Sequence, residues 1–187
     1  RPRGLGARPG AVGPAGVPPV TSRIEGFLFR HRDRLLALWG IVAAVLTWPP
    51  RGAPWSVVLL GCGFALRLWA RAHIGPHSRG RSLEAPERCA GGPYRFLAHP
   101  LYVANLLVLS ALAFVLAGPG IAALAIVSGP AALYVVLGRA ESRHLRDAAP
   151  PVRTSALPRA ARKLRSEWAS LLPPLVLWAA LQVLAAP

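Results

Sequence analysis

Long apolar runs alternate with short basic segments along this chain. Apolar residues dominate about 35–48, 54–72, 101–117, 121–138 and 168–186. A helix needs about 20 residues to cross the ~30 Å of hydrocarbon in a bilayer, and several runs approach or reach that length. The pattern predicts an all-α, polytopic membrane helix bundle with about five transmembrane helices.

Prolines and glycines divide these runs. Pro49-Pro50 ends the first, and Gly118-Pro119-Gly120 predicts a tight turn that makes the third and fourth a hairpin. Pro173-Pro174 should kink the last. Residues 1–21 are rich in Pro and Gly and are predicted to be a disordered tail. The membrane domain then covers 22–187, with a short interfacial helix leading into the first span.

The charges are distributed unevenly between the two ends of the predicted bundle. The chain has 22 Lys and Arg against 7 Asp and Glu, for a net charge of +15. Only Arg51 falls in the loops of one side and only Arg67 inside a span. The positive-inside rule then places the N-terminus in the cytoplasm of a cell (inner) membrane protein. The basic segments should contact anionic lipid headgroups rather than nucleic acid, because they lie between apolar runs.

Polar residues gather where the third run begins. Pro100 suits the first turn of a helix, and His99, Tyr102 and Asn105 recur at a spacing that puts them on one helix face. The hairpin brings Glu141 back to the end where His99 lies, since each arm is long enough to cross the membrane. The sequence therefore predicts a polar pocket at the cytoplasmic border, walled by apolar helices.

This region resembles the isoprenylcysteine carboxyl methyltransferase-like family of integral membrane methyltransferases, to which phospholipid N-methyltransferases are related. The resemblance extends over about residues 61–145 and is carried by Leu66-Arg67-Leu68-Trp69-Ala70, Gly92-Pro93-Tyr94, His99-Pro100-x-Tyr102, and Glu141 with Leu145. It implies S-adenosylmethionine as cofactor. It also implies methyl transfer to a lipophilic small-molecule or lipid-linked acceptor, with carboxyl O-methylation favoured over amine N-methylation.

The chemistry of the cofactor indicates how these residues would hold it. Glu141 could accept hydrogen bonds from its ammonium or its ribose hydroxyls, and His99 or Arg95 could donate to its carboxylate. The ring faces of Tyr94 and Tyr102 could contact its adenine or its sulfonium. The expected cofactor-binding residues are Gly92, Tyr94, Arg95, His99, Pro100, Tyr102, Asn105 and Glu141. Arg67 and Glu141 are the expected catalytic residues. No metal ion is expected, because His73, His77 and Cys89 have no fourth ligand nearby.

Several alternatives stay open at this point. Arg67 either holds an acceptor carboxylate in its planar fork or extends toward the basic face, since a charge inside a span costs ~2.5–3.5 kcal/mol. Tyr102 and Asn105 alone would also fit bonds between helices. A non-catalytic membrane protein that binds lipid or a partner is the main rival, favoured by Ala98 and Ser142, which depart from the family pattern. A sterol-reductase-like relative is more distant, and nothing indicates an oligomeric state.

Overall fold

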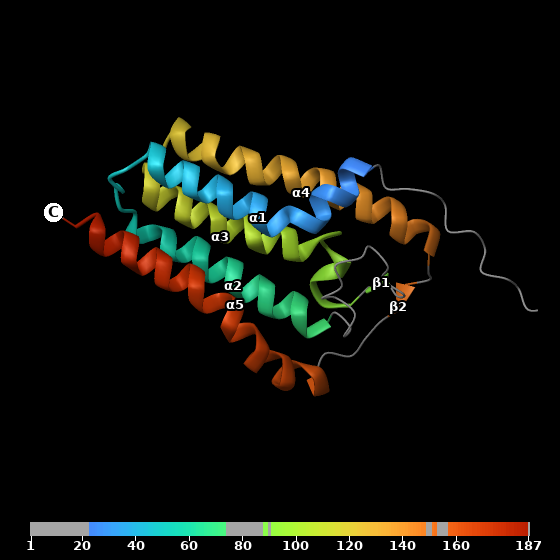
Figure 1. Ribbon diagram of the computed structural model, residues 1–187. Helices are drawn as coiled ribbons and strands as arrows, with labels where there is room; N and C mark the ends of the chain where they lie inside the picture. Colours follow the sequence, from blue (N-terminus) through green and yellow to red (C-terminus); the bar gives the residue numbers. More distant parts are fainter. Residues whose placement is uncertain (1–22, 74–87, 90, 149–150, 153–156, 187) are drawn as a thin grey trace, which may run out of the picture.

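Five long helices lie side by side in the computed structural model, which describes residues 23–73, 88–89, 91–148, 151–152 and 157–186 (Figure 1). They are α1 (Arg23–Leu46), α2 (Val57–His73), α3 (Pro100–Ala117), α4 (Ile121–Ala148) and α5 (Leu157–Leu184). The 3₁₀ helices η1 (Pro54–Ser56) and η3 (Gly92–Arg95) lie in the connections before α2 and α3. Strands β1 (Arg88–Cys89) and β2 (Pro151–Val152) form a short parallel pair. The predicted all-α bundle is confirmed.

Helix ends differ from the predicted spans where charged residues follow apolar ones. The interfacial helix and the first span form one continuous helix, α1, and α4 continues to Ala148 instead of ending at residue 138. An apolar pattern marks the edge of the membrane, whereas arginine, glutamate and alanine extend a helix readily into water. Pro173 and Pro174 lie within α5. The tail predicted for residues 1–21 lies outside the described residues.

Three of the described helices are long and apolar enough to cross a membrane, namely Pro54–His73, Pro100–Ala117 and Ile121–Arg143. The apolar part of α5, Ala169–Leu184, is shorter. Large apolar residues also face outward, for example Val58 with a relative exposure of 64% and Leu124 with 65%. Such a surface is typical of lipid contact, since soluble monomers rarely expose contiguous apolar patches of this kind.

Close packing of α2 on α3 sets the position of the polar residues. A Cβ atom on Gly63 of α2 would lie 2.8 Å from Val108 Cγ2 and 2.9 Å from the Ala104 carbonyl oxygen of α3. Only glycine allows the two backbones to approach this closely. One turn closer to the start of α2, Leu60 packs with Val108 and Ala111 in a buried cluster, and Trp178 of α5 packs against this cluster. The next turn of α2 toward the basic end carries Arg67, which therefore lies against α3.

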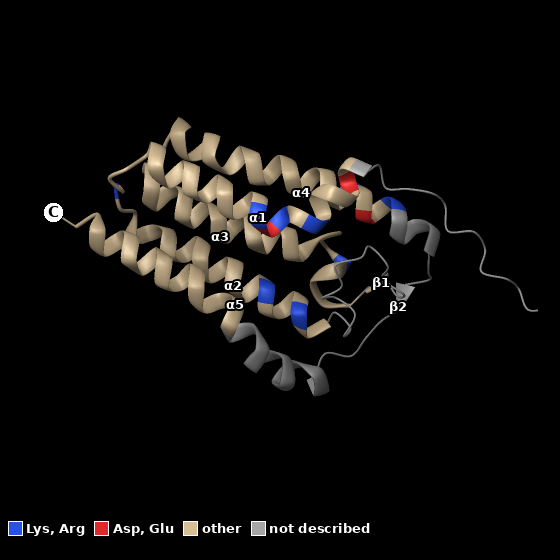
Figure 2. Ribbon diagram, in the orientation of Figure 1, with Lys and Arg blue, Asp and Glu red and all other residues tan. Residues whose placement is uncertain are grey.

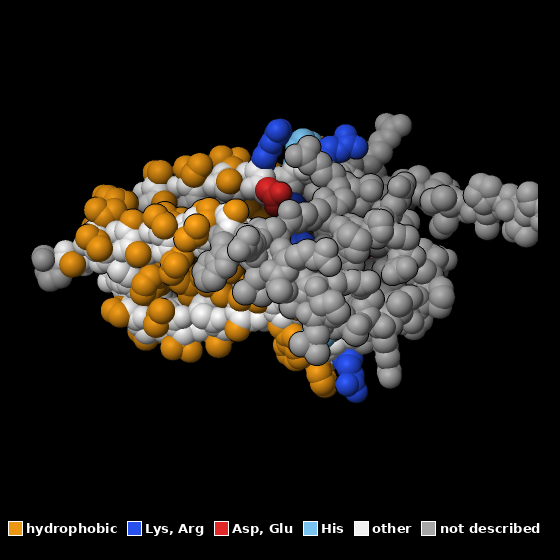
Figure 3. Space-filling view, turned by 90° about the horizontal axis from the view of Figure 1, so that it is seen from below, with side chains coloured by type: hydrophobic (Ala, Val, Ile, Leu, Met, Phe, Trp, Pro, Cys, Tyr) orange, Lys and Arg blue, Asp and Glu red, His pale blue; other side chains and the backbone are white. Residues whose placement is uncertain are grey.

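The bundle has one polar and one apolar end. The N-terminus of α1, the end of α2, the start of α3 and the end of α4 meet at one end, and the C-terminus of the chain lies at the other (Figure 1). Figure 2 shows that the Lys, Arg, Asp and Glu of the described residues gather toward the first end, apart from Arg51 in the connection before α2. On the face that Figure 3 draws, hydrophobic side chains spread over the rest of the bundle. The predicted grouping of the basic segments is confirmed for the described residues, while their cytoplasmic orientation stays a prediction.

Candidate functional site

The start of α3 lies at the centre of the polar end. Pro100 is the first residue of the helix and is buried, and the His99 carbonyl accepts hydrogen bonds from the backbone N–H groups of Tyr102 (3.1 Å) and Val103 (3.3 Å). The His99 ring lies over Gly138 of α4, where a Cβ atom would come within 3.0 Å of Cδ2. Proline and glycine thus fix the place of the imidazole from both helices.

Two consecutive residues of α4 hold the two ring nitrogens of His99. Nδ1 lies 3.3 Å from Glu141 Oε2, and Nε2 lies 2.7 Å from Ser142 Oγ. A carboxylate only accepts, so the Glu141 contact requires a hydrogen on Nδ1. The ring then donates to Glu141 through Nδ1 and shares a second hydrogen bond with the Ser142 hydroxyl through Nε2. The predicted meeting of His99 and Glu141 is confirmed.

An aromatic stack continues from His99 into the bundle. The His99 and Tyr102 ring centroids are 5.4 Å apart, and those of Tyr102 and Tyr134 are 5.1 Å apart, both in stacked geometry. The Tyr102 hydroxyl is also within hydrogen-bonding range of Glu141. Three rings and one carboxylate therefore form a single contiguous unit shared by α3 and α4.

Arg67 and Asn105 extend this unit toward the middle of the membrane. Arg67 Nη1 of α2 donates to Asn105 Oδ1 of α3, and the Asn105 side chain also lies near the Tyr134 hydroxyl of α4. Asn105 lies about 9 Å further along α3 than His99 at the rise of an α-helix. Arg67 therefore faces the junction of three helices instead of extending to the basic surface. We call the set His99, Tyr102, Asn105, Tyr134, Glu141, Ser142 and Arg67 the polar column.

The η3 turn places Tyr94 beside the polar column. Gly92 has a φ of +55°, and a Cβ atom there would lie 2.5 Å from His73 Nδ1, so glycine is needed for both reasons. The Cys89 thiol donates to the His73 carbonyl at 3.3 Å. Burial raises the pKa of the Tyr94 phenol, and the neighbouring Cys89 and Glu141 raise it further against an opposing effect of Arg71. The phenol is therefore a neutral donor at physiological pH.

One predicted cofactor-binding residue lies apart from the polar column. Arg95 is exposed, with its guanidinium carbon 5.9 Å from the centre of the Phe96 ring. His77, for which no zinc role is expected, lies outside the described residues. Within the described ranges, no three His, Cys, Asp or Glu side chains are grouped so as to hold a metal ion.

Sequence reasoning noted Ser142 only as a departure from the family pattern, and it missed three further residues of this region. Tyr134 and Gly138 precede Glu141 at helical spacing and share its face of α4, and Arg71 follows Arg67 by one turn of α2. That spacing was a usable signal. It was hidden because tyrosine and glycine are ordinary in membrane helices, and because Arg71 reads as the first residue of a basic loop.

Comparison with known proteins identifies the family to which this arrangement belongs. The profile of the phospholipid methyltransferase family matches residues 53–148, slightly more than half of the 187-residue chain. The matched range contains all of the polar column and the η3 turn. Searches of curated proteins and of solved structures gave no match. On the strength of the family match, the chain belongs to the phospholipid methyltransferase family.

Proposed function

We propose that this protein transfers a methyl group from S-adenosylmethionine to the carboxylate of a lipophilic acceptor, at the cytoplasmic border of the membrane. Membership in a methyltransferase family supports the reaction class. The resemblance of the His99-Pro100-x-Tyr102 motif and Glu141 to carboxyl methyltransferases supports the carboxyl acceptor. The observation that carries the proposal is the polar column, which leads from Glu141 at the border to Arg67 among apolar helices.

The residues present fit S-adenosylmethionine. Tyr94 Oη is buried, and no described residue bonds it, so it is a donor available to a ligand. Glu141 offers a carboxylate to an ammonium or to hydroxyls, and the stacked rings of His99 and Tyr102 offer π faces to a cation. The donor set thus has a complement for each charged part of the cofactor.

Arg67 is the acceptor-side residue of the proposal. Its bond to Asn105 aims a planar guanidinium into the helix junction, where it can hold a carboxylate in two parallel bonds. When bound, S-adenosylmethionine supplies a methyl group on a positive sulfur. An acceptor carboxylate oxygen would form the new bond with a lone pair, the electrons of the broken S–C bond would stay on sulfur, and the products would be a methyl ester and a thioether. No proton moves, so Arg67 has only to align the nucleophile.

Amine N-methylation is the second candidate. An amine acceptor must lose a proton, and the His99–Glu141 pair at the border is a possible acceptor for it. The family description also names phospholipids as acceptors. Against this, Arg67 places a positive charge beside the position where a cationic ammonium would have to bind, which is unfavourable in an apolar environment.

The chemistry of the product tests the proposal. Purified protein in lipid nanodiscs is incubated with a bacterial lipid extract and methyl-labelled S-adenosylmethionine. We expect lipid-soluble label that mild base releases as volatile methanol, because an ester is base-labile. Arg67→Leu should lower turnover at least 100-fold, or ~2.7 kcal/mol, and Arg67→Lys should recover part of it.

Arg51→Leu is the matched control, since Arg51 lies at the opposite end of the bundle, where Nη1 donates to the Ala117 carbonyl at 2.6 Å. It should keep wild-type turnover. Base-stable label would show N-methylation instead. No labelled product from folded protein would favour the non-catalytic rival, and full turnover by Arg67→Leu would remove the carboxylate role of Arg67.

A further inference from the structure

The buried hydroxyl of Tyr94 lies beside the polar column and forms no hydrogen bond with any of its members. Leaving a buried donor unsatisfied costs on the order of 1–3 kcal/mol, and Tyr94 Oη is in that position among the described residues. Its location is fixed, because η3 is held against α2 by the tight contact of Gly92 with His73 and by the bond from Cys89 to the His73 carbonyl. A bound ligand that accepts from the phenol would remove this cost.

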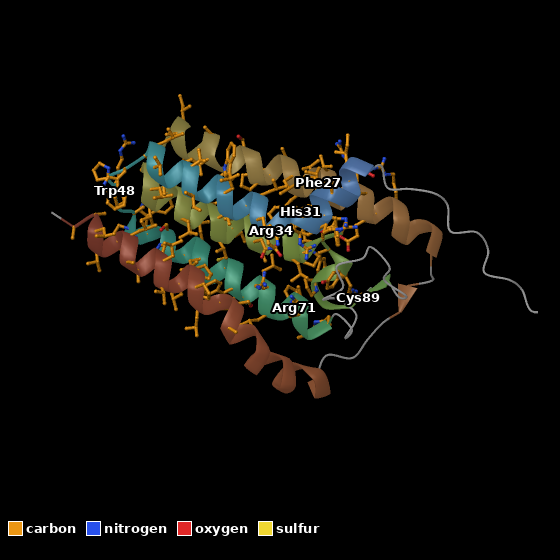
Figure 4. All side chains as sticks on the ribbon, in the orientation of Figure 1. Phe27, His31, Arg34, Trp48, Arg71 and Cys89 are labelled. Carbon is orange, nitrogen blue, oxygen red and sulfur yellow. The ribbon has the colours of Figure 1, made fainter. Side chains whose placement is uncertain are left out.

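Two opposite charges lie near enough to the phenol to act on it electrostatically. Arg71 comes from the last turn of α2 and Glu141 from α4, and they shift the pKa of Tyr94 in opposite directions. Figure 4 shows Arg71 at the end of α2 with Cys89 beside it, both at the polar end of the bundle. Arg71 lies one turn beyond Arg67, so α2 presents one arginine to the helix junction and one to the border.

We propose that Arg71, Tyr94 and Glu141 form a subsite for a zwitterionic α-amino acid group, the methionine end of the cofactor. Arg71 and the Tyr94 hydroxyl bind the carboxylate, and Glu141 binds the ammonium. A guanidinium and a phenolic hydroxyl are donors that the two oxygens of a carboxylate can satisfy together, and the carboxylate of Glu141 suits the adjacent ammonium. This inference rests on the proposed use of S-adenosylmethionine and adds Arg71 to the site.

The assignment explains why position 94 is a tyrosine whose hydroxyl oxygen is buried. A phenol whose pKa is raised by burial keeps its proton and can only strengthen a bond to an anion, whereas a phenolate would repel the carboxylate. Phenylalanine at position 94 would fill the same space without the donor. In this assignment the Tyr94 ring contributes packing, whereas its hydroxyl binds the ligand.

Two ligands that differ only at the amino acid end test the subsite. S-adenosylhomocysteine carries the amino acid group, and 5′-methylthioadenosine has the same nucleoside and thioether without it. Binding of each to purified protein in detergent is measured by calorimetry. We expect the wild type to bind S-adenosylhomocysteine at least tenfold more tightly. Arg71→Leu should remove that preference and leave affinity for 5′-methylthioadenosine unchanged, and Tyr94→Phe should reduce the preference at least threefold.

Arg139→Leu serves as the control, because Arg139 is an exposed arginine on α4. It should keep the wild-type preference. Equal losses for both ligands in Arg71→Leu, or no loss for either, would overturn the subsite while cofactor use stands. If the folded wild type binds neither ligand, cofactor use fails and the subsite with it. Circular dichroism of each variant confirms that it is folded.

Discussion

At the scale of single residues, His99 is held more completely than a surface histidine would be. Both ring nitrogens have partners on α4, and the ring edge touches Gly138. Ser142, which departs from the family pattern, supplies one of those partners. Ala98 is exposed and takes no part in the polar column. The departures from the family pattern therefore leave the arrangement around His99 intact.

A glycine substitution tests whether the position of His99 matters for binding. In Gly138→Ala the added methyl group would lie 3.0 Å from His99 Cδ2, so the imidazole must shift relative to Glu141. We expect affinity for S-adenosylhomocysteine, measured by calorimetry, to fall at least fivefold.

Gly61→Ala is the matched control, because a Cβ atom at Gly61 of α2 has nothing within 4 Å. Both changes raise helix propensity by about 1 kcal/mol, so the comparison isolates the contact with His99. Unchanged affinity in Gly138→Ala would mean that the exact placing of His99 is unimportant.

At the scale of elements, α1 is attached to α4 by a bond that a proline makes possible. Pro130 lies inside α4 and has no N–H, which leaves the Ile126 carbonyl without its helical donor. The Trp39 indole of α1 donates to that oxygen at 2.8 Å. Gly129 leaves room for the indole, since a Cβ atom there would lie 2.7 Å from Trp39 Cζ2.

Removing the indole donor should weaken the bundle. Trp39→Phe leaves a carbonyl unsatisfied in an apolar region, and we expect it to lower the free energy of unfolding by about 1 kcal/mol. Gly129→Ala should lower the free energy of unfolding in the wild-type background. It should lower it less in a Trp39→Ala background, because the added methyl group clashes with the indole. Unfolding is followed by circular dichroism in mixed micelles with increasing dodecyl sulfate.

Gly40→Ala is the control on α1, where the added methyl group meets nothing within 4 Å. It should not destabilise the protein. If Trp39→Phe unfolds with the same free energy as the wild type, the hydrogen bond from Trp39 to the Ile126 carbonyl contributes nothing to stability.

At the scale of the whole molecule, periodicity and charge predicted most of the architecture. The hairpin of α3 and α4, the grouping of basic segments and the meeting of His99 with Glu141 all follow from span length and the turn at 118–120. The continuation of α4 to Ala148 did not follow, because hydropathy reports the membrane edge and not the helix end. The end of α4 is nonetheless the element that carries Ser142 to His99.

Side-chain partners were the part that the sequence left undetermined. Arg67 had two open interpretations, and only the close approach of α2 to α3 at Gly63 decides that it bonds Asn105. Trp39 and Ile126 are likewise brought together by packing that no local pattern encodes. One-dimensional spacing places residues on a face, but which face meets which depends on the rotation of each helix in the bundle.

The most direct measurement of the central claim is calorimetric binding of S-adenosylmethionine to the purified protein. We expect the wild type to bind, and His99→Ala and Glu141→Gln each to weaken binding at least tenfold, or ~1.4 kcal/mol, because each removes one member of the pair at the border. Arg139→Ala, on the exposed surface of α4, should bind like the wild type. Equal affinity in all four folded proteins, or no binding by the wild type, would contradict a cofactor site at the polar column.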